Sequence, residues 1–222
     1  MVTTLYLIRH GETEGSETKR YKGSIDVPMS EKGIEQIKGT SVFIRNRIQD
    51  KKNHESCIVH SASSKLSAVY CSPLSRALKS AEIIAVPHGL KPIVIEDLRE
   101  RSFGIWEGMT FTEIKENYPK EFEAWAGNPL RYSPVDGEST IEIKERAVNA
   151  VDRILGNHNT EHIAIVAHGG VNRIILCHVM GIPLENIFRI EQDFAAVNII
   201  EFWEKYPVVK LINGQASLEY NW

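Results

Sequence analysis

The chain has 222 residues, enough for one domain with a substantial core, and its formal net charge of −3 comes from interspersed acidic and basic residues. The sequence shows no basic face of the kind that binds nucleic acid and no apolar run near the ~20 residues of a membrane span, so we expect neither partner. The cysteines Cys57, Cys71 and Cys177 lack paired spacing, which excludes a disulfide framework and, without a signal-peptide pattern at the N-terminus, favours the cytoplasm.

The first third of the chain predicts a strand, a helix and a second strand. Residues 3–8 are apolar and rich in β-formers, which predicts a strand buried on both faces. The polar segment 54–67 has no period and is expected to be a surface excursion before a second strand at 68–72. Between these strands, isoleucines at helical spacing predict a helix from Glu31 with one apolar stripe: Ile34, Ile37, Ile44 and Ile48.

The middle of the chain continues this alternation. Ser72 and Pro73 are expected to be the N-cap and first residue of a helix with an apolar face. Residues 91–97 predict a third strand, and residues 110–128 carry two short helical patterns rich in acidic and aromatic side chains. We expect the insertion at about 104–138 to form a helical lid within a single domain that spans residues 1–222.

The last third predicts a helix, a strand, a helix and two strands. Ser139 and Glu142 form a capping box for a helix that ends at Gly156. Residues 162–167 predict a fourth strand closed by His168 and two glycines, and a helix marked by Val171, Ile174, Ile175 and Val179 follows. Residues 195–203 and 207–213 predict two final strands joined by a turn.

Strands that alternate with helices predict an α/β three-layer sandwich, with a mostly parallel central sheet flanked by helices. Ligands of such sheets bind beyond the carboxyl ends of the strands. Arg9 and His10 end the first strand, His168 ends the fourth, and Arg76 lies in the first turn of a helix. Arginine forks and a helix N-terminus suit an anion, and Glu100, just past the third strand, would bring a carboxyl group to the same edge.

Each of these residues also has a simpler interpretation. An isolated arginine near a strand end is more often a solvated or salt-bridged surface residue, and a histidine before glycine is often a turn residue. Glu100 belongs to a charged run with Glu96 and Asp97, and the pattern alone does not choose among these acids. The other histidines lack cysteine or acidic partners at ligand spacing, so we expect no metal site.

Five segments, in order, resemble a known family. They are "LIRHGET" (7–13), "YKGSIDVPMSEKG" (21–33), "YCSPLSRALKSAEIIA" (70–85), "LRERSFGIWEG" (98–108) and "VAHGG" (166–170). Together they resemble the histidine phosphatase superfamily, also called phosphoglycerate mutase-like, over most of the chain. The resemblance implies that family's α/β fold and a covalent phosphohistidine. It assigns His10 as the nucleophile, Arg9 and Arg76 as phosphate clamps, His168 as a second histidine of the phosphate pocket and Glu100 as the proton donor.

The resemblance also implies a substrate cradle. The residues that align with it are Thr13, Ser16, Arg20, Lys22 and Gly23, and we add Gly169 beside His168. The loop departs from the family pattern at two adjacent positions, because many members carry Trp and Asn where this chain has Gly15 and Ser16. An asparagine amide contact therefore does not carry over, and the sequence leaves open whether the Ser16 hydroxyl replaces it.

We expect from this resemblance a phosphomonoesterase that hydrolyses a small phosphorylated metabolite without a metal or cofactor. A cofactor-dependent phosphoglycerate mutase is one alternative, although such mutases carry a longer, basic insertion after the acid block. An inactive relative that binds a phosphorylated ligand is another. The segment 18–33 resembles bacterial α-ribazole phosphatases, but similar loops occur in sugar phosphatases and broad-specificity enzymes. The sequence does not determine the oligomeric state, and a homodimer is left open.

Overall fold

In the computed structural model, which describes residues 2–54 and 65–216, six strands form one sheet in the order β3-β2-β4-β1-β5-β6. β3, β2, β4 and β1 run parallel, whereas β5 and β6 are antiparallel to their neighbours. The sheet is therefore mostly parallel, as predicted. The strands are β1 (Thr3–Arg9), β2 (Ala68–Cys71), β3 (Ile93–Val94), β4 (His162–Ala167), β5 (Val197–Phe202) and β6 (Pro207–Gly214).

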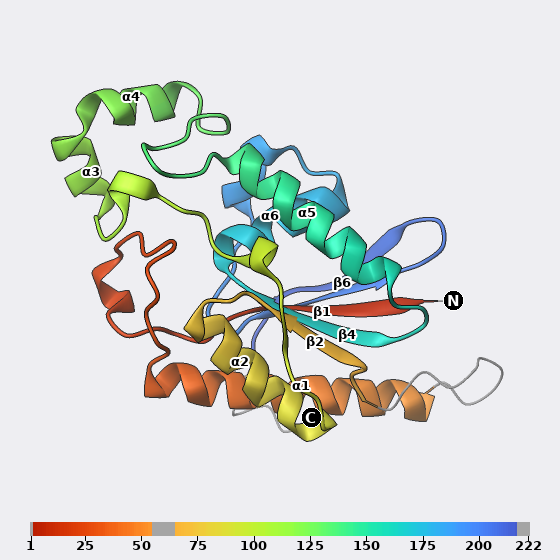
Figure 1. Ribbon diagram of the computed structural model, residues 1–222. Coiled ribbons are helices and arrows are strands. Elements are labelled where there is room, and N and C mark those ends of the chain that lie inside the picture. Colours follow the sequence, from red (N-terminus) through yellow and green to blue (C-terminus); the bar gives the residue numbers. More distant parts are fainter. Residues whose placement is uncertain (1, 55–64, 217–222) are drawn as a thin grey trace.

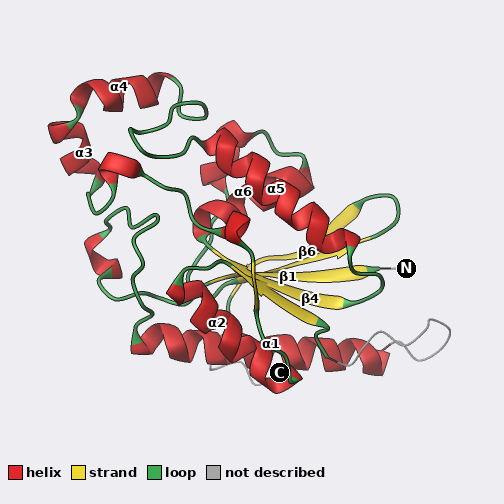
Figure 2. Ribbon diagram, viewed as in Figure 1, coloured by secondary structure: helices red, strands yellow, loops and turns green. Residues whose placement is uncertain are grey.

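Four helices cover the two faces of this sheet (Figure 1). α1 (Glu31–His54) and α2 (Ser75–Ala85) pack on one face, and α5 (Thr140–Gly156) and α6 (Gly169–Met180) pack on the other. Figure 2 shows the same arrangement as helical layers above and below the strands. The three-layer sandwich predicted from the alternation of elements is confirmed.

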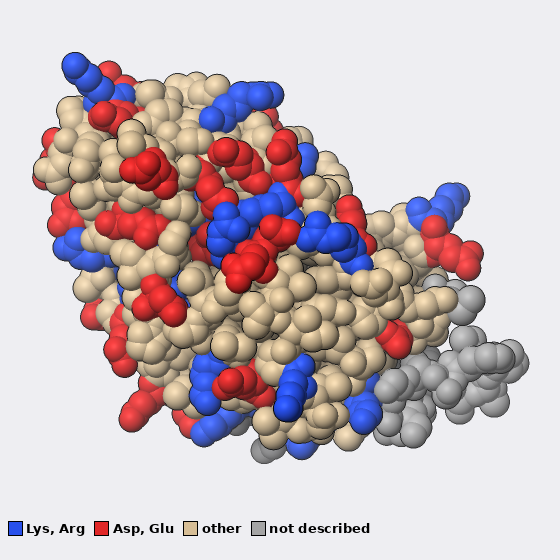
Figure 3. Space-filling view, viewed as in Figure 1, with Lys and Arg blue, Asp and Glu red and all other residues tan. Residues whose placement is uncertain are grey.

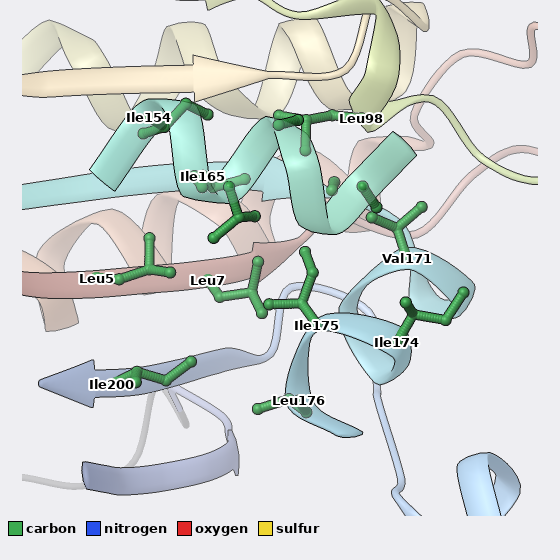
Figure 4. Close-up of a cluster of buried hydrophobic side chains, with 14 of the residues drawn as sticks. Leu5, Leu7, Leu98, Ile154, Ile165, Val171, Ile174, Ile175, Leu176 and Ile200 are labelled. Atoms are coloured by element: carbon green, nitrogen blue, oxygen red, sulfur yellow. The ribbon is translucent and has the colours of Figure 1, made fainter. Parts of the chain in front are cut away.

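The side chains of β1 alternate between two hydrophobic cores, one on each face of the sheet. Leu5 and Leu7 pack with the α5 and α6 side, and Tyr6 and Ile8 pack with the α1 and α2 side. Successive strand residues point to opposite faces, so a strand between two helical layers must be apolar throughout. Figure 4 shows Leu5, Leu7 and their neighbours against α5 and α6. Each fully buried side chain of this size contributes ~1.5–3 kcal/mol.

The segment 104–138 contains α3 (Phe111–Asn117) and α4 (Pro119–Gly127), which confirms the two short helices predicted there. α3 begins with a capping box, because Thr110 accepts a hydrogen bond from the Glu113 N–H and the Glu113 carboxylate accepts one from the Thr110 N–H. α4 has no buried residue. Figure 1 shows both helices, and the loop that follows β1, at the carboxyl end of the parallel strands.

Three predicted boundaries are wrong. α2 begins at Ser75 with Leu74 as its N-cap, and Ser72 instead accepts a hydrogen bond from the Leu74 N–H within the preceding loop. The third strand is limited to Ile93–Val94, because β3 pairs with β2 on one side only and the chain then turns into a short 3₁₀ helix. α6 begins at Gly169, directly after His168, rather than near Val171. The capping box at Ser139 and Glu142 is confirmed.

The predicted surface excursion at 54–67 lies mostly outside the described residues. On the face drawn in Figure 3, acidic and basic side chains lie next to one another. Within residues 2–54 and 65–216, no helix has both the length and the apolar character that crossing a membrane requires.

Candidate active site

The pairing of β1 with β4 brings two histidines together. In this parallel pair Arg9 lies opposite Ala167, and the His10 N–H donates to the Ala167 carbonyl at 3.1 Å. His10 and His168 are therefore the next residues along two adjacent strands. Their ring centroids are 5.1 Å apart in an edge-on arrangement, and both side chains are buried.

The tautomer of His10 is set by its own neighbour. His10 Nδ1 lies 2.7 Å from the Gly11 carbonyl oxygen, which can only accept, so Nδ1 carries the proton. The lone pair is then on Nε2. Burial, reinforced by the charges of Arg9 and Arg76, lowers the pKa of His10 well below its usual value. The ring is thus neutral at neutral pH, which is the form that attacks phosphorus.

His168 lies beside His10 and contacts Ser72, the residue that follows β2. Its Nε2 is 2.7 Å from the Ser72 hydroxyl oxygen, and its Nδ1 is buried with no hydrogen-bond partner in the part of the chain described here. Burial is the main cause that lowers the pKa of His168 well below the usual value, followed by the fields of His10 and Arg76. A buried imidazole with one unpaired nitrogen has hydrogen-bonding capacity left for a ligand.

Arg9 is held by the segment before β5. Its Nη1 donates to the Gln192 carbonyl at 2.6 Å, and its Cζ lies 3.8 Å from the centroid of the Phe194 ring. Burial lowers the pKa of Arg9 to about 10, which leaves the guanidinium charged at neutral pH. Its Nε is buried and has no hydrogen-bond partner among the described residues, so at least this donor is left for an anion.

Arg76 reaches the site from the first turn of α2. Its Nη2 donates to the Gly23 carbonyl at 2.7 Å and its Nη1 to the Ile25 carbonyl at 2.8 Å, and burial lowers its pKa. These two carbonyls fix the plane of the guanidinium. Gly23 has a φ of +43°, and a Cβ there would lie 2.6 Å from the Arg101 carbonyl oxygen, so this turn requires glycine.

Glu100 enters from the loop after β3 and lies at the amino end of α6. Its two carboxylate oxygens accept hydrogen bonds from the N–H groups of Arg101, at 3.0 Å, and Gly170, at 3.2 Å. A Cβ on residue 170 would lie 2.7 Å from the carboxylate, so glycine permits this close approach. The carboxylate also faces the charges of Arg9 and Arg76.

These groups meet at a cavity of about 570 Å³. Four of the five residues assigned to catalysis line it, and His168 lies beside His10 instead. All six residues assigned to substrate binding also line it: Thr13, Ser16, Arg20, Lys22, Gly23 and Gly169.

The binding residues differ in how they are held. Lys22 donates to the Thr13 hydroxyl at 3.2 Å and to the Glu14 carbonyl. Ser16 lies in a 3₁₀ turn, Ser16–Thr18. Arg20 forms a bidentate ion pair with Glu113 of α3, at 2.7 and 3.0 Å. Its guanidinium therefore connects the loop after β1 to the segment 104–138.

Sequence reasoning missed several residues of the site. Ser72 was expected to be an N-cap, yet it contacts His168 because β2 and β4 are neighbours in the sheet. Phe194 and Gln192, which contact Arg9, belong to no motif. Their contacts could be predicted only from the position of β5 in the sheet. The aromatic residues that line the outer cavity were expected only as part of a lid.

The arrangement defines a class of protein. The neutral imidazole of His10 is buried in the field of Arg9 and Arg76 and shares a cavity with the Glu100 carboxylate at the carboxyl end of a parallel sheet. This arrangement suits transfer of an anionic group such as phosphoryl. Among the described residues, no three His, Cys, Asp or Glu side chains are grouped so as to hold a metal ion.

Comparison with known proteins identifies the family. The model of the histidine phosphatase superfamily (branch 1) matches residues 5–215, so the chain belongs to that superfamily. It is 27% identical to phosphoserine phosphatase 1 of Hydrogenobacter thermophilus, over 94% of this chain and 91% of that one. It is 25% identical to the adenosylcobalamin/alpha-ribazole phosphatase of Escherichia coli, over 96% of each. The solved structure of Bacillus stearothermophilus YhfR superposes with a TM-score of 0.74 at 32% identity, covering 97% of this chain and 98% of that one.

Proposed function

We propose that the protein is a phosphomonoesterase that hydrolyses a small phosphorylated metabolite through a phosphohistidine on His10. The observation that carries this proposal is the state of His10: buried, neutral, and with Nδ1 bound to the Gly11 carbonyl so that Nε2 bears the lone pair. Nε2 attacks phosphorus as the bond to the ester oxygen breaks. Negative charge then spreads over three equatorial oxygens, which Arg9, Arg76 and the unpaired His168 nitrogen would stabilise.

Glu100 is the proposed proton donor. It gives a proton to the departing alkoxide and then takes one from the water that attacks the phosphohistidine, so inorganic phosphate leaves and His10 is regenerated. The position of the carboxylate on the cavity wall, between the arginines and the amino end of α6, supports this role. The segment 104–138 is the proposed lid, tied to the substrate cradle by Arg20 and Glu113.

The names of the relatives support phosphate ester hydrolysis and differ in substrate. α-Ribazole 5′-phosphate and phosphoserine are therefore the first metabolites to test. We place the reaction in the cytoplasm, since its buried free thiols Cys71 and Cys177 suit a reducing compartment.

Covalent labelling tests the proposal directly. The protein is mixed with ³²P-labelled phosphate ester, quenched in alkali, and assayed for acid-labile phosphate on the chain. We expect label and turnover in the wild type, and neither in His10→Ala. His178→Ala, which alters an exposed histidine of α6, is the matched control and should keep both. A labelled and active His10→Ala protein would remove His10 as the nucleophile.

A further inference from the structure

The outer part of the cavity is aromatic. Phe111 of α3 and Phe122 and Trp125 of α4 all line it, and their rings contact one another, with centroids 5.1 to 6.3 Å apart. The capping box at Thr110 and the proline that begins α4 fix the directions of the two helices. These three residues, Phe111, Phe122 and Trp125, form an aromatic wall of the cavity that His10 also lines.

This wall is not part of the hydrophobic core. α4 has no buried residue, and Phe111 is 48% exposed. Phe188, which reaches the cavity from the segment after α6, is 78% exposed. A ligand that covers exposed apolar surface beside a cavity lowers the free energy of the system. An aromatic cluster with a purely structural role would instead be buried by its own helices.

The cavity is also larger than a phosphoryl group requires. Its volume of about 570 Å³ lies within the range of pockets that hold whole small molecules. Beyond the charged floor, its inner wall continues with Trp106, Ile114, Ile143 and Ile174. The apolar residues and the proposed phosphoryl site therefore belong to one cavity, whose volume leaves room for more than a phosphoryl group.

Several cationic groups of the cavity already have partners on the protein. Arg20 is paired with Glu113, and Lys22 donates to Thr13 and Glu14. Arg101 donates to the carbonyls of Glu138 and Tyr132 and to the Thr140 hydroxyl. These bonds use part of the donor set of each group, and the ion pair with Glu113 already offsets the charge of Arg20. Arg173, whose Nε donates to the Ile190 carbonyl, and Lys19 also line the cavity and offer competing carboxylate sites.

We propose that the substrate's alcohol carries an apolar aromatic ring, which stacks on Phe111, Phe122 and Trp125 while the phosphoryl group lies at His10. This inference rests on the proposed phosphomonoesterase function and specifies its substrate class. Aromatic rings contact one another favourably in offset or edge-on geometry, and the three rings of the wall offer both faces and edges.

The test compares three esters that share a primary alkoxide leaving group: ethyl phosphate, 2-phenylethyl phosphate and O-phosphoserine. Because intrinsic reactivity is similar, kcat/KM reports recognition of the alcohol. We expect 2-phenylethyl phosphate to exceed both others by at least about tenfold, the effect of burying one ring. Equal values for the ethyl and phenylethyl esters would overturn the inference and leave the phosphatase function intact. A preference for O-phosphoserine would also overturn it and would point to Arg173 or Lys19.

Variants locate the effect. Trp125→Ala and Phe122→Ala should bring the ratio of the phenylethyl to the ethyl kcat/KM close to one, and Trp125→Phe should keep most of that ratio. Trp203→Ala removes a half-exposed tryptophan that does not line the cavity and should leave the ratio unchanged. A ratio that stays high in both Trp125→Ala and Phe122→Ala would show that the ring binds elsewhere.

A binding measurement separates this inference from the proposed function. 2-Phenylethylphosphonate and ethylphosphonate cannot be hydrolysed as esters, and titration calorimetry compares their affinities directly. We expect the phenylethyl compound to bind at least about tenfold more tightly. Such a preference without any turnover would uphold the aromatic site while the hydrolase proposal failed, and equal affinities would overturn the aromatic site.

Discussion

The Ser72 hydroxyl oxygen lies 2.7 Å from Nε2 of His168, and both side chains are fully buried. This contact joins the ends of two adjacent parallel strands, because Cys71 pairs with Val166 one step earlier. It fixes the orientation of the His168 ring and so the direction of Nδ1, the nitrogen proposed to contact phosphate.

We expect Ser72→Ala to lower kcat by about tenfold with little change in KM, because the unsatisfied His168 would turn away from the developing charge. Leaving a buried group without its partner also costs ~1–3 kcal/mol of stability. Steady-state kinetics and urea unfolding measure the two effects. Ser67→Ala, at the other end of the same strand, is the control and should leave kcat unchanged. An unaltered kcat in Ser72→Ala would limit Ser72 to a structural role.

The two arginines are expected to contribute as fixed charge stabilisers. Arg9→Ala and Arg76→Ala should each lose ~10²–10³ in kcat, the typical effect of removing one preorganised donor. Lysine at position 76 should not restore activity, because the guanidinium bonds to Gly23 and Ile25 require a planar fork. Arg45→Ala, on the exposed side of α1, is the control. Losses below tenfold in folded variants would contradict the assignment.

Glu100 should matter most for poor leaving groups. An alkyl alkoxide must be protonated as it departs, whereas nitrophenolate leaves without help, so Glu100→Gln should slow alkyl phosphate hydrolysis far more than aryl. Single-turnover rates of phosphohistidine formation with ethyl phosphate and 4-nitrophenyl phosphate make the comparison. If both rates fell equally, Glu100 would not be the acid of the first step.

The buried histidines predict an acid-sensitive fold. His10 and His168 both have a pKa lowered well below 6.5, so below that pH the unfolded chain binds protons that the folded chain does not. The contribution of these neutral histidines to the free energy of unfolding is complete above pH ~6.5. It decreases as the pH falls toward the folded-state pKa, by up to ~1.4 kcal/mol per pH unit for each group. Urea unfolding at pH 7.5 and 5.5 measures this slope, which should be shallower in His168→Gln. An identical slope in that variant would rule out His168 as a source.

The protein is expected to hydrolyse phosphoglycerate, if it accepts it, rather than isomerise it. A mutase must hold a bisphosphorylated intermediate, which requires a second anion site and exclusion of water. The segment 107–136 has more acidic than basic residues, so its field opposes a second phosphate: Glu107, Glu113, Glu116, Glu121, Glu123 and Asp136 against Lys115, Lys120 and Arg131.

The measurement is a time course with 3-phosphoglycerate and a trace of 2,3-bisphosphoglycerate. Release of inorganic phosphate should outpace formation of 2-phosphoglycerate. The opposite order would favour the mutase.

The sequence was sufficient to predict the parts of the site that follow parallel strands. Arg9, His10 and His168 directly follow apolar runs, and the rule that ligands bind beyond the carboxyl ends of strands predicts from the sequence that they meet. Phe194 and Gln192 escaped this rule because β5 is antiparallel to β1, which places its amino end at the site. Strand direction at that edge depends on tertiary pairing, which local periodicity does not encode.

Ser72 was missed for a related reason. Its contact with His168 depends on β2 and β4 being neighbours, although the strands are far apart in sequence. The third strand was predicted too long because an apolar run at a sheet edge resembles a central strand, whereas pairing on one side ends it after two residues. The start of α5 was predicted accurately because its capping box, Ser139 and Glu142, is a local signal.

The absence of buried residues in α4 has a consequence for how fast different parts of the molecule open. Elements with few buried contacts unfold locally at a small free-energy cost, whereas β1 and β4, buried along most of their length, open only with the whole molecule. Amide hydrogens of α4 should therefore exchange with deuterium orders of magnitude faster than those of the central strands. A ligand that binds against this helix would slow the exchange of its amides selectively. The protected amides would then identify the part of the protein that contacts the ligand.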